Sequence, residues 1–268
     1  MKSLRLTNDS DADVESEVLN DLEQLNISET AGSGKGCSDH GCALVSLQQR
    51  FDINKIEKTA KKFRLNFNEG DLRSLTIPDE QLHDYAIDLY LQLVIGRAND
   101  DRLSNQELPK AYAFSSSFLY SYENYHYDVV KGAIDDLQKY DLLLFPVNEN
   151  GVHWCLAVVH TGTWTIEYYD PLWNQKNETA HTDSVKKVNT IRDYLSEQME
   201  TQNMEYRTCS VHFIRDIPQQ QNSYDCGVFV CKYAECIVLR KEMRFEQKQM
   251  SQFRSQIARD MENGALGS

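Results

Sequence analysis

The sequence Ile217-Pro218-Gln219-Gln220-Gln221-Asn222-Ser223-Tyr224-Asp225-Cys226-Gly227-Val228-Phe229-Val230-Cys231 joins a polar loop to an apolar run that continues through Leu239. The run is hydrophobic nearly all round, which predicts a helix buried in the core. Asp225 is expected to cap this helix, because its carboxylate can accept from the unpaired amides of the first turn. Cys226 would then lie at the positive end of the helix dipole, where a thiolate is favoured. The stretch therefore predicts a cysteine nucleophile.

The alternative for Cys226 is a small buried hydrophobe, which is what most free cysteines are. That alternative fits Cys231 and Cys236, which lie inside the apolar run, whereas a polar loop precedes Cys226. A thiol phosphatase is excluded, because it needs an arginine six residues after the cysteine to grip phosphate, and Lys232 stands there. A Cys226 nucleophile requires a base from elsewhere in the chain.

The composition predicts an acidic globular protein. Of its 268 residues, 41% are hydrophobic and 10% aromatic, and the formal net charge is −13. This charge argues against nucleic-acid binding and against anionic membrane surfaces. Seven cysteines without framework spacing argue for a reducing compartment, the nucleus or the cytoplasm. The chain has no signal-peptide core and no apolar run of membrane-spanning length, so we expect a soluble protein without membrane insertion.

Three divisions of the chain are expected. Residues 1–54 have the acidic and Gly/Ser-rich composition of a flexible tail. Residues 55–262 form the folded domain, and residues 263–268 are expected to be loose. The segment 37–42 (Cys-Ser-Asp-His-Gly-Cys) contains metal-ligand types, but no second pair lies near it, so no metal site is predicted.

The folded domain is predicted to mix helices and strands. Apolar spacing indicates helices at 71–98, 128–138, 183–202 and 245–261. Short apolar segments indicate strands at 142–147, 152–159, 164–170 and 210–216, with a hairpin loop at 160–163. The tyrosine-rich segment 112–127 lacks interleaved Lys or Arg, so packing is predicted there rather than base stacking.

The strand hairpin supplies a candidate base for Cys226 and a carboxylate to orient it. His153 begins one strand and Asp170 ends the next, so the two side chains can meet at one rim of the sheet. Among the other histidines His212 remains a candidate, because its strand leads to the nucleophile loop. A cysteine, a histidine and a carboxylate in this arrangement are typical of nucleophilic catalysis.

The polar loop supplies a candidate oxyanion donor. Gln220 lies six residues before Cys226 and can aim its amide beside the thiolate. Together with the Cys226 backbone amide it would stabilise the tetrahedral intermediate of acyl transfer. The neighbours Gln219 and Gln221 remain alternatives by chemistry alone.

Three motifs resemble those of the Ulp/SENP family of SUMO-specific cysteine proteases: Gly-Val-His153-Trp154-Cys-Leu-Ala-Val-Val, Tyr-Tyr-Asp170-Pro, and Ile-Pro-Gln-Gln220-Gln-Asn-Ser-Tyr-Asp-Cys226-Gly. The resemblance runs from about Phe63 to the C-terminal helix. It implies His153 as base, Asp170 as its orienter, Gln220 as oxyanion donor and Cys226 as nucleophile. It also implies a papain-like cysteine protease fold of the α+β class, with a central mixed sheet flanked by helices and the triad in the permuted order His, Asp, Cys.

The resemblance also suggests substrate-binding residues. Trp154 matches the tryptophan that covers the substrate's Gly-Gly end in a narrow tunnel. The family's Trp-Leu-Asn-Asp motif aligns with Gln81-Leu82-His83-Asp84, which adds Gln81 and Asp84 as substrate-binding positions. Gln81 cannot give the apolar cover of tryptophan, and Gly132-Ala133 stands where the family has Arg-Trp in its substrate-facing region. The catalytic residues match the family, whereas the substrate grip differs.

The function implied is a thiol isopeptidase that cleaves after the C-terminal Gly-Gly of SUMO, removes SUMO from lysines and matures its precursor. Its partners would be SUMO or SUMO-conjugated proteins, with no cofactor, and the protein is expected to be a monomer. One alternative is a deconjugase for another ubiquitin-like modifier such as NEDD8 or ubiquitin, and another is an acyltransferase with the same triad. A third, from another class, is a SUMO-binding module with little turnover.

Overall fold

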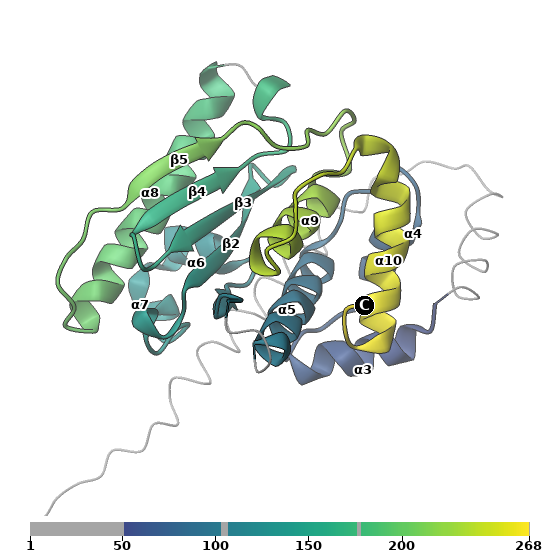
Figure 1. Ribbon diagram of the computed structural model, residues 1–268, viewed down its shortest axis with the longest axis horizontal. Coiled ribbons are helices and arrows are strands. Elements are labelled where there is room, and N and C mark those ends of the chain that lie inside the picture. Colours follow the sequence, from purple (N-terminus) through teal and green to yellow (C-terminus); the bar gives the residue numbers. More distant parts are fainter. Residues whose placement is uncertain (1–50, 103–106, 176–177, 268) are drawn as a thin grey trace, which may run out of the picture. The chain divides into compact units, whose positions relative to one another are not determined.

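The computed structural model describes residues 51–102, 107–175 and 178–267, and a five-stranded mixed sheet lies at the centre of this part (Figure 1). The strand order is β1-β2-β3-β4-β5. The middle three strands are antiparallel, and the outer strands β1 and β5 run parallel to their neighbours. The predicted central mixed sheet is confirmed. The strands are β1 (Ala111–Ala113), β2 (Leu142–Glu149), β3 (His153–His160), β4 (Thr165–Tyr169) and β5 (Ser210–Ile214).

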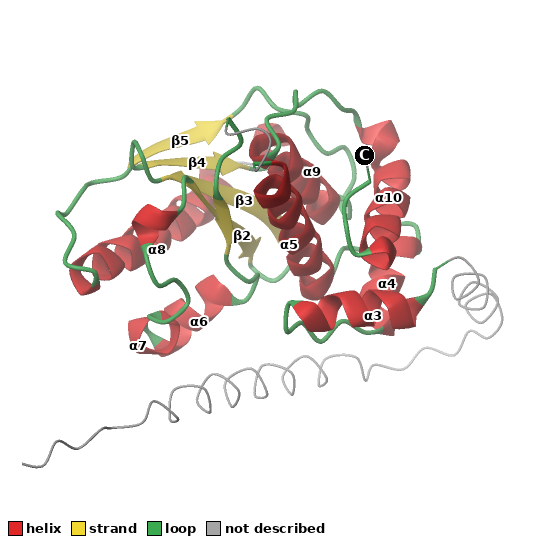
Figure 2. Ribbon diagram, turned by 60° about the horizontal axis from the view of Figure 1, so that its bottom comes forward, coloured by secondary structure: helices red, strands yellow, loops and turns green. Residues whose placement is uncertain are grey.

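Helices cover both faces of the sheet, because its central strands are apolar on both sides (Figure 2). One face, with Leu156 and Val158, packs against α5 (Asp84–Asp101) and α9 (Cys226–Val238). The other face, with Ala157 and Tyr168, packs against α6 (Phe118–Tyr125) and α8 (Glu178–Thr201). The remaining helices are α3 (Ile53–Lys62), α4 (Glu69–Thr76), α7 (Tyr127–Val130) and α10 (Met250–Asn263), with 3-10 turns at Leu137–Lys139, Trp173–Gln175 and Gln247–Gln249.

Two of the predicted helices are wrong in extent. The helix predicted at 71–98 is two helices, because α4 ends at Thr76 and α5 begins at Asp84. The break follows from Pro78, which disfavours helical backbone at the preceding residue, and Ile77 is extended with φ −85° and ψ 128°. The helix predicted at 128–138 reduces to the four residues of α7 and a later 3-10 turn. Gly132 lies where that helix would continue, and glycine disfavours helix.

Both predicted boundaries of the folded domain need correction. At the N-terminal side, Phe51 is buried in the core and α3 begins at Ile53. At the C-terminal side, Leu266 is buried and the Gly267 amide donates to Asp260 Oδ1 at 2.9 Å, so residues 263–267 are not loose. The rest of the predicted tail and the segment 37–42 lie outside the described residues. Among the described helices, none combines the length and the apolar character needed to cross a membrane.

Asp88 is a buried carboxyl group on α5, and its protonation should make the free energy of unfolding depend on pH. It accepts from the Ser116 amide at 2.8 Å and from the Ser116 hydroxyl at 3.0 Å. Burial disfavours the carboxylate more than these hydrogen bonds favour it, which raises the pKa of Asp88 to about 8. The folded state therefore binds a proton that the unfolded state releases near its ordinary pKa of about 4, so this contribution to stability is complete below that value and is lost as the pH rises towards 8.

We expect the free energy of unfolding of the wild type to fall from pH 5 to pH 8, by up to about 1.4 kcal/mol per pH unit from this group. Asp88→Asn cannot titrate but keeps an oxygen for the Ser116 amide, so it should flatten the slope. Urea unfolding at pH 5, 6, 7 and 8 measures both slopes, with Asp128→Asn at an exposed position as control. Equal slopes in the wild type and Asp88→Asn would refute the assignment.

Candidate active site

Cys226 is the first residue of α9 and is only 1% exposed. The helix behind it is buried on nearly all sides, as predicted, with Val228, Phe229 and Cys231 inaccessible to solvent. Gly227 allows the segment between α4 and α5 to approach this end of the helix, because a Cβ at Gly227 would lie 2.8 Å from Leu82 Cβ. The sequence Cys-Gly thus places the thiol at a helix N-terminus, next to the segment that contains Leu82.

The capping hydrogen bond predicted for Asp225 is wrong. Asp225 occupies the N-cap position but its side chain accepts from no amide of the helix. It accepts instead from Arg254 Nε at 2.9 Å, Asn222 Nδ2 at 2.7 Å and Gln247 Nε2 at 2.7 Å. A buried carboxylate is stabilised more by a guanidinium and two amide side chains than by a helix end alone.

Arg254 on α10 is the main residue that the sequence analysis missed. It is 6% exposed, and besides Asp225 it donates to the carbonyl oxygens of Ser74 and Glu80, both at 2.7 Å, and of Tyr224 at 3.0 Å. It therefore links the last turn of α4 and the segment that follows it to the loop before Cys226. An arginine at i+4 from Met250 and i−3 from Ile257, on the buried face of a helix, was the signal that could have revealed it.

His153 and Asp170 meet at one rim of the sheet, as the hairpin predicts. Nε2 of His153 lies 2.7 Å from Oδ1 of Asp170. The register pairs Leu156 with Tyr169, so Asp170 continues β4 beside Cys155 and His153 lies two residues further along the same face. Asp170 is 0% exposed, and its Oδ1 also accepts from the Leu172 amide at 2.8 Å. The carboxylate is therefore fixed where it can orient the imidazole.

The imidazole of His153 lies between two thiols. Burial penalises the imidazolium, but the hydrogen bonds of Asp170, Cys155 and Cys226 outweigh that effect and raise the pKa of His153. Burial also raises the pKa of the Cys155 thiol to about 12, so this thiol is neutral near pH 7. The Asp170 carboxylate is then the charge that favours the imidazolium. The result is a base that holds a proton firmly once it has received it.

The side-chain amide of Gln220 forms hydrogen bonds within its own loop. Gln220 is 0% exposed, and its Nε2 donates to the Asn222 carbonyl at 2.6 Å and to Asn222 Oδ1 at 3.2 Å. Within the described residues its Oε1 has no hydrogen-bond partner. Asn222 organises the loop, since its Oδ1 also accepts from the Asp225 amide at 3.1 Å. The Gln220 amide, predicted as the oxyanion donor, therefore donates to the turn formed at Asn222.

Two of the three predicted substrate-binding residues support the loops around the catalytic groups. Gln81 Nε2 donates to the Val152 carbonyl at 3.1 Å and to the Ser223 carbonyl at 3.0 Å. It thus bridges the residue before His153 to the loop before Cys226. Trp154 is buried, and its indole N–H donates to the Leu82 carbonyl at 3.0 Å.

The third predicted substrate-binding residue, Asp84, is exposed at the start of α5. Gly132, one of the two departures from the family pattern, is also exposed, and a Cβ there would meet no atom within 4 Å. Space for a larger side chain is therefore present at Gly132.

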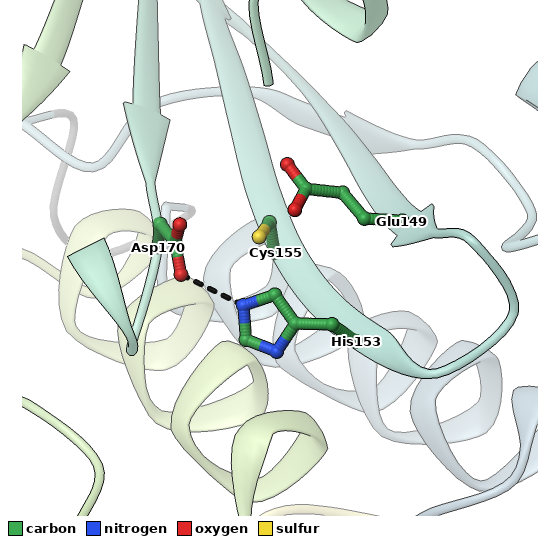
Figure 3. A group of neighbouring side chains, drawn as sticks. All are labelled: Glu149, His153, Cys155 and Asp170. Carbon is green, nitrogen blue, oxygen red and sulfur yellow. Dashed lines mark hydrogen bonds and ion pairs between the residues drawn. The ribbon is translucent and has the colours of Figure 1, made fainter. Parts of the chain in front are cut away.

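Four side chains at the rim could together hold a metal ion. They are Glu149, His153, Cys155 and Asp170, and one potential ligand atom of each lies within 4.8 Å of the others (Figure 3). Glu149 and Cys155 had no role in the sequence analysis. Both lie on strands of the hairpin that carries the base, at the end of β2 and near the start of β3.

Comparison with known proteins gives a family match. Residues 80–266 match the family described as Ulp1 protease family, C-terminal catalytic domain. A sentrin-specific protease of Caenorhabditis elegans is 32% identical over 209 residues, which are 76% of this chain and 28% of that protein. A putative ubiquitin-like-specific protease 1B of Arabidopsis thaliana is 27% identical over 219 residues, 77% of this chain and 61% of that protein. The chain thus spans less than two thirds of the length of these relatives.

A solved structure gives the same fold. The C-terminal Ulp1 protease domain in complex with Smt3, the yeast ortholog of SUMO, matches with a TM-score of 0.58 and 22% identity, over 81% of this chain and 98% of that one. The predicted α+β fold of the papain-like type, with its central mixed sheet flanked by helices, is confirmed.

Proposed function

This chain belongs to the Ulp1 protease family, and on that premise we propose that it is a cysteine protease that cleaves after the C-terminal Gly-Gly of a SUMO-type modifier. Release of the modifier from lysine and maturation of its precursor both require this cleavage. The contact that carries the proposal is the 2.7 Å hydrogen bond between His153 and Asp170, formed beside Cys226 at a helix N-terminus. The names of the relatives, sentrin-specific protease and SUMO protease Ulp1, support the substrate class.

In this mechanism Cys226 is the nucleophile and His153 the base. His153 takes the thiol proton as the sulfur attacks the carbonyl carbon of the second glycine, and later gives a proton to the leaving amine. Asp170 holds the ring and stabilises the imidazolium, which agrees with the raised pKa of His153. Water then hydrolyses the acyl-enzyme, and no cofactor takes part.

The oxyanion would be bound by the Cys226 backbone amide and the Gln220 side chain. Because the Gln220 amide donates to Asn222 in the free protein, it has to turn when substrate enters. The buried Oε1 atom, which has no hydrogen-bond partner in the described part of the chain, makes the present orientation costly. Substrate binding would then relieve an unfavourable arrangement.

A panel of modifier substrates tests the substrate class. SUMO, NEDD8 and ubiquitin, each carrying a fluorogenic C-terminal amide, are compared by kcat/KM with the full chain. We expect turnover of SUMO above the other two. Preferred turnover of NEDD8 or ubiquitin would leave the proposed mechanism unchanged but would make that modifier the substrate. The glutamine at position 81, where the family has tryptophan, motivates this second candidate.

Gln81 is expected to act as a positioning residue for this reaction. Gln81→Met keeps the length of the side chain but removes both donors, and two net hydrogen bonds are worth about 1 kcal/mol each. We expect kcat to fall by up to roughly 30-fold with KM little changed, because the loops of His153 and Cys226 lose their bridge. Steady-state kinetics on the preferred fluorogenic modifier measure the split. A rise in KM at constant kcat would instead make Gln81 a substrate contact.

We also propose that the protein acts in the nucleus or the cytoplasm. All five cysteines among the described residues are free, which suits a reducing compartment. Imaging of a fluorescent fusion tests this proposal, and a secreted product would refute it.

A further inference from the structure

A mixed set of metal-ligating side chains surrounds the Nε2 side of the His153 ring. The carboxylates of Glu149 and Asp170, the Cys155 thiol and the imidazole supply one candidate atom each, all within 4.8 Å of one another. Figure 3 shows the three other side chains gathered on one side of the ring, with the second ring nitrogen turned away from them. The proposed mechanism uses only His153 and Asp170 from this set.

We propose that these four side chains form an inhibitory zinc site. Thiolate, imidazole and carboxylate are the ligands that Zn²⁺ takes in proteins, and four of them complete the tetrahedral shell of a closed site. Magnesium and calcium prefer oxygen-only shells, so a set that contains sulfur and nitrogen discriminates against them. The Cys155 thiol gives up its proton to solvent when the zinc–sulfur bond forms.

The geometry fits a zinc ion after small movements of side chains. Zinc bonds of about 2.0 to 2.3 Å in a tetrahedron place ligand atoms roughly 3.3 to 3.7 Å apart, so atoms that now lie up to 4.8 Å apart need to close by about 1.5 Å at most. The 2.7 Å hydrogen bond between Nε2 and Asp170 opens as the ion enters between them. Of the four side chains His153 is the most exposed, at 9%, so the ion would enter past its ring.

Groups outside the set already orient the two carboxylates. Tyr168 and Ser184 donate their hydroxyls to Glu149 Oε1 at 2.8 and 2.7 Å, and the Leu172 amide donates to Asp170 Oδ1 at 2.8 Å. Such outer contacts are the usual support of protein metal sites, because they fix ligand orientation. The carboxylates would therefore lose little freedom when they bind the ion.

Cys226 is not part of the set. It touches the set only through its hydrogen bond with His153. Zinc would remove the base and its orienter from catalysis while it leaves the nucleophile unligated. This inhibition rests on the proposed function, whereas zinc binding itself does not, so the experiment measures binding without reference to activity.

The binding experiment compares four forms of the full chain by competition for Zn²⁺ with a fluorescent chelator. We expect one equivalent of Zn²⁺ to bind the wild type and Cys226→Ala with equal affinity. Cys155→Ser should bind at least ~10-fold more weakly, because loss of a ligand costs no less than loss of an outer contact. Cys209→Ser changes another buried cysteine, outside the set, and should bind as the wild type does.

Spectroscopy and a second variant identify the ligands. Substitution with Co²⁺ should give a thiolate-to-metal charge-transfer band in the wild type and Cys226→Ala, and no such band in Cys155→Ser. Glu149→Gln, which keeps an acceptor for Tyr168 and Ser184, should also weaken Zn²⁺ binding. Loss of binding in Cys226→Ala but not in Cys155→Ser would place the ion on the catalytic thiol and overturn the proposal. Absence of Zn²⁺ binding by the wild type would also overturn it.

Discussion

Replacement of Cys226 by alanine is expected to lower the rate of modifier cleavage by ~10⁴-fold or more, because removal of a nucleophile eliminates the covalent route. Cys231→Ala is the matched control, since this second cysteine lies on the same helix and is also buried. It should retain a rate of the same order as the wild type. Single-turnover hydrolysis of the preferred fluorogenic modifier measures both variants.

Asp170→Asn extends this test to the orienting carboxylate. The amide keeps the shape but cannot stabilise the imidazolium, so we expect a loss of ~10²- to 10⁴-fold. The double variant Cys226→Ala/Asp170→Asn should be no slower than Cys226→Ala, because the residues act as a unit. Full activity of Cys226→Ala would contradict the assignment of the nucleophile, and a further large loss in the double variant would contradict the shared mechanism.

Replacement of Arg254 by methionine is expected to destabilise the fold by about 3–5 kcal/mol, the typical result of removing one partner from a buried ion pair. In the wild type Arg254 Nη2 lies 2.8 Å from Asp225 Oδ1. Methionine fills the volume of the arginine but leaves the Asp225 carboxylate buried without its ion-pair partner. The carbonyl oxygens of Ser74, Glu80 and Tyr224 lose their donor as well. Equilibrium unfolding in urea gives the loss directly.

Arg259→Met is the control for Arg254, because Arg259 lies on the same helix and is exposed. It should change stability by less than about 0.5 kcal/mol. Asp225→Asn combined with Arg254→Met should cost less than the sum of the two single changes, since both remove the same pair. Equal losses for Arg254→Met and Arg259→Met would show that the buried pair does not stabilise the loop.

The sequence predicted the sheet better than the helices. The strands predicted at 142–147, 152–159 and 164–170 are short apolar runs separated by turn signals, and they correspond to β2, β3 and β4, whose neighbours in sequence are neighbours in space. The prediction of one helix at 71–98 gave no weight to Pro78, and the prediction of a helix at 128–138 gave no weight to Gly132. Local backbone preferences prevailed over apolar spacing at both places.

The pairing of His153 with Asp170 could be predicted because one hairpin carries both residues. The environment of Asp225 could not, because Arg254 arrives from a helix 29 residues later. The orientation of Gln220 depends on the turn at Asn222, and the bridging position of Gln81 depends on loops 71 and 142 residues away. Such contacts follow from tertiary packing, and a single sequence carries no direct signal for them.

The zinc-ligating set was overlooked for a related reason. Structural zinc sites usually show closely spaced ligand pairs in the sequence, and the segment with such spacing is 37–42. Glu149, His153 and Cys155 are close in sequence, but the turn between β2 and β3 separates Glu149 from the other two, and Asp170 directly follows β4. The set becomes visible only once the register of the three strands is known.

The most direct test of the central claim is the reaction of the full chain with SUMO whose C-terminal carboxyl is replaced by a vinyl-sulfone electrophile, followed by intact mass and peptide mapping. We expect a single adduct, carried by Cys226, absent from Cys226→Ala and retained by Cys231→Ala. An adduct on another cysteine, or no adduct with a folded wild-type protein, would contradict the assignment of Cys226 as the nucleophile of a SUMO-directed protease.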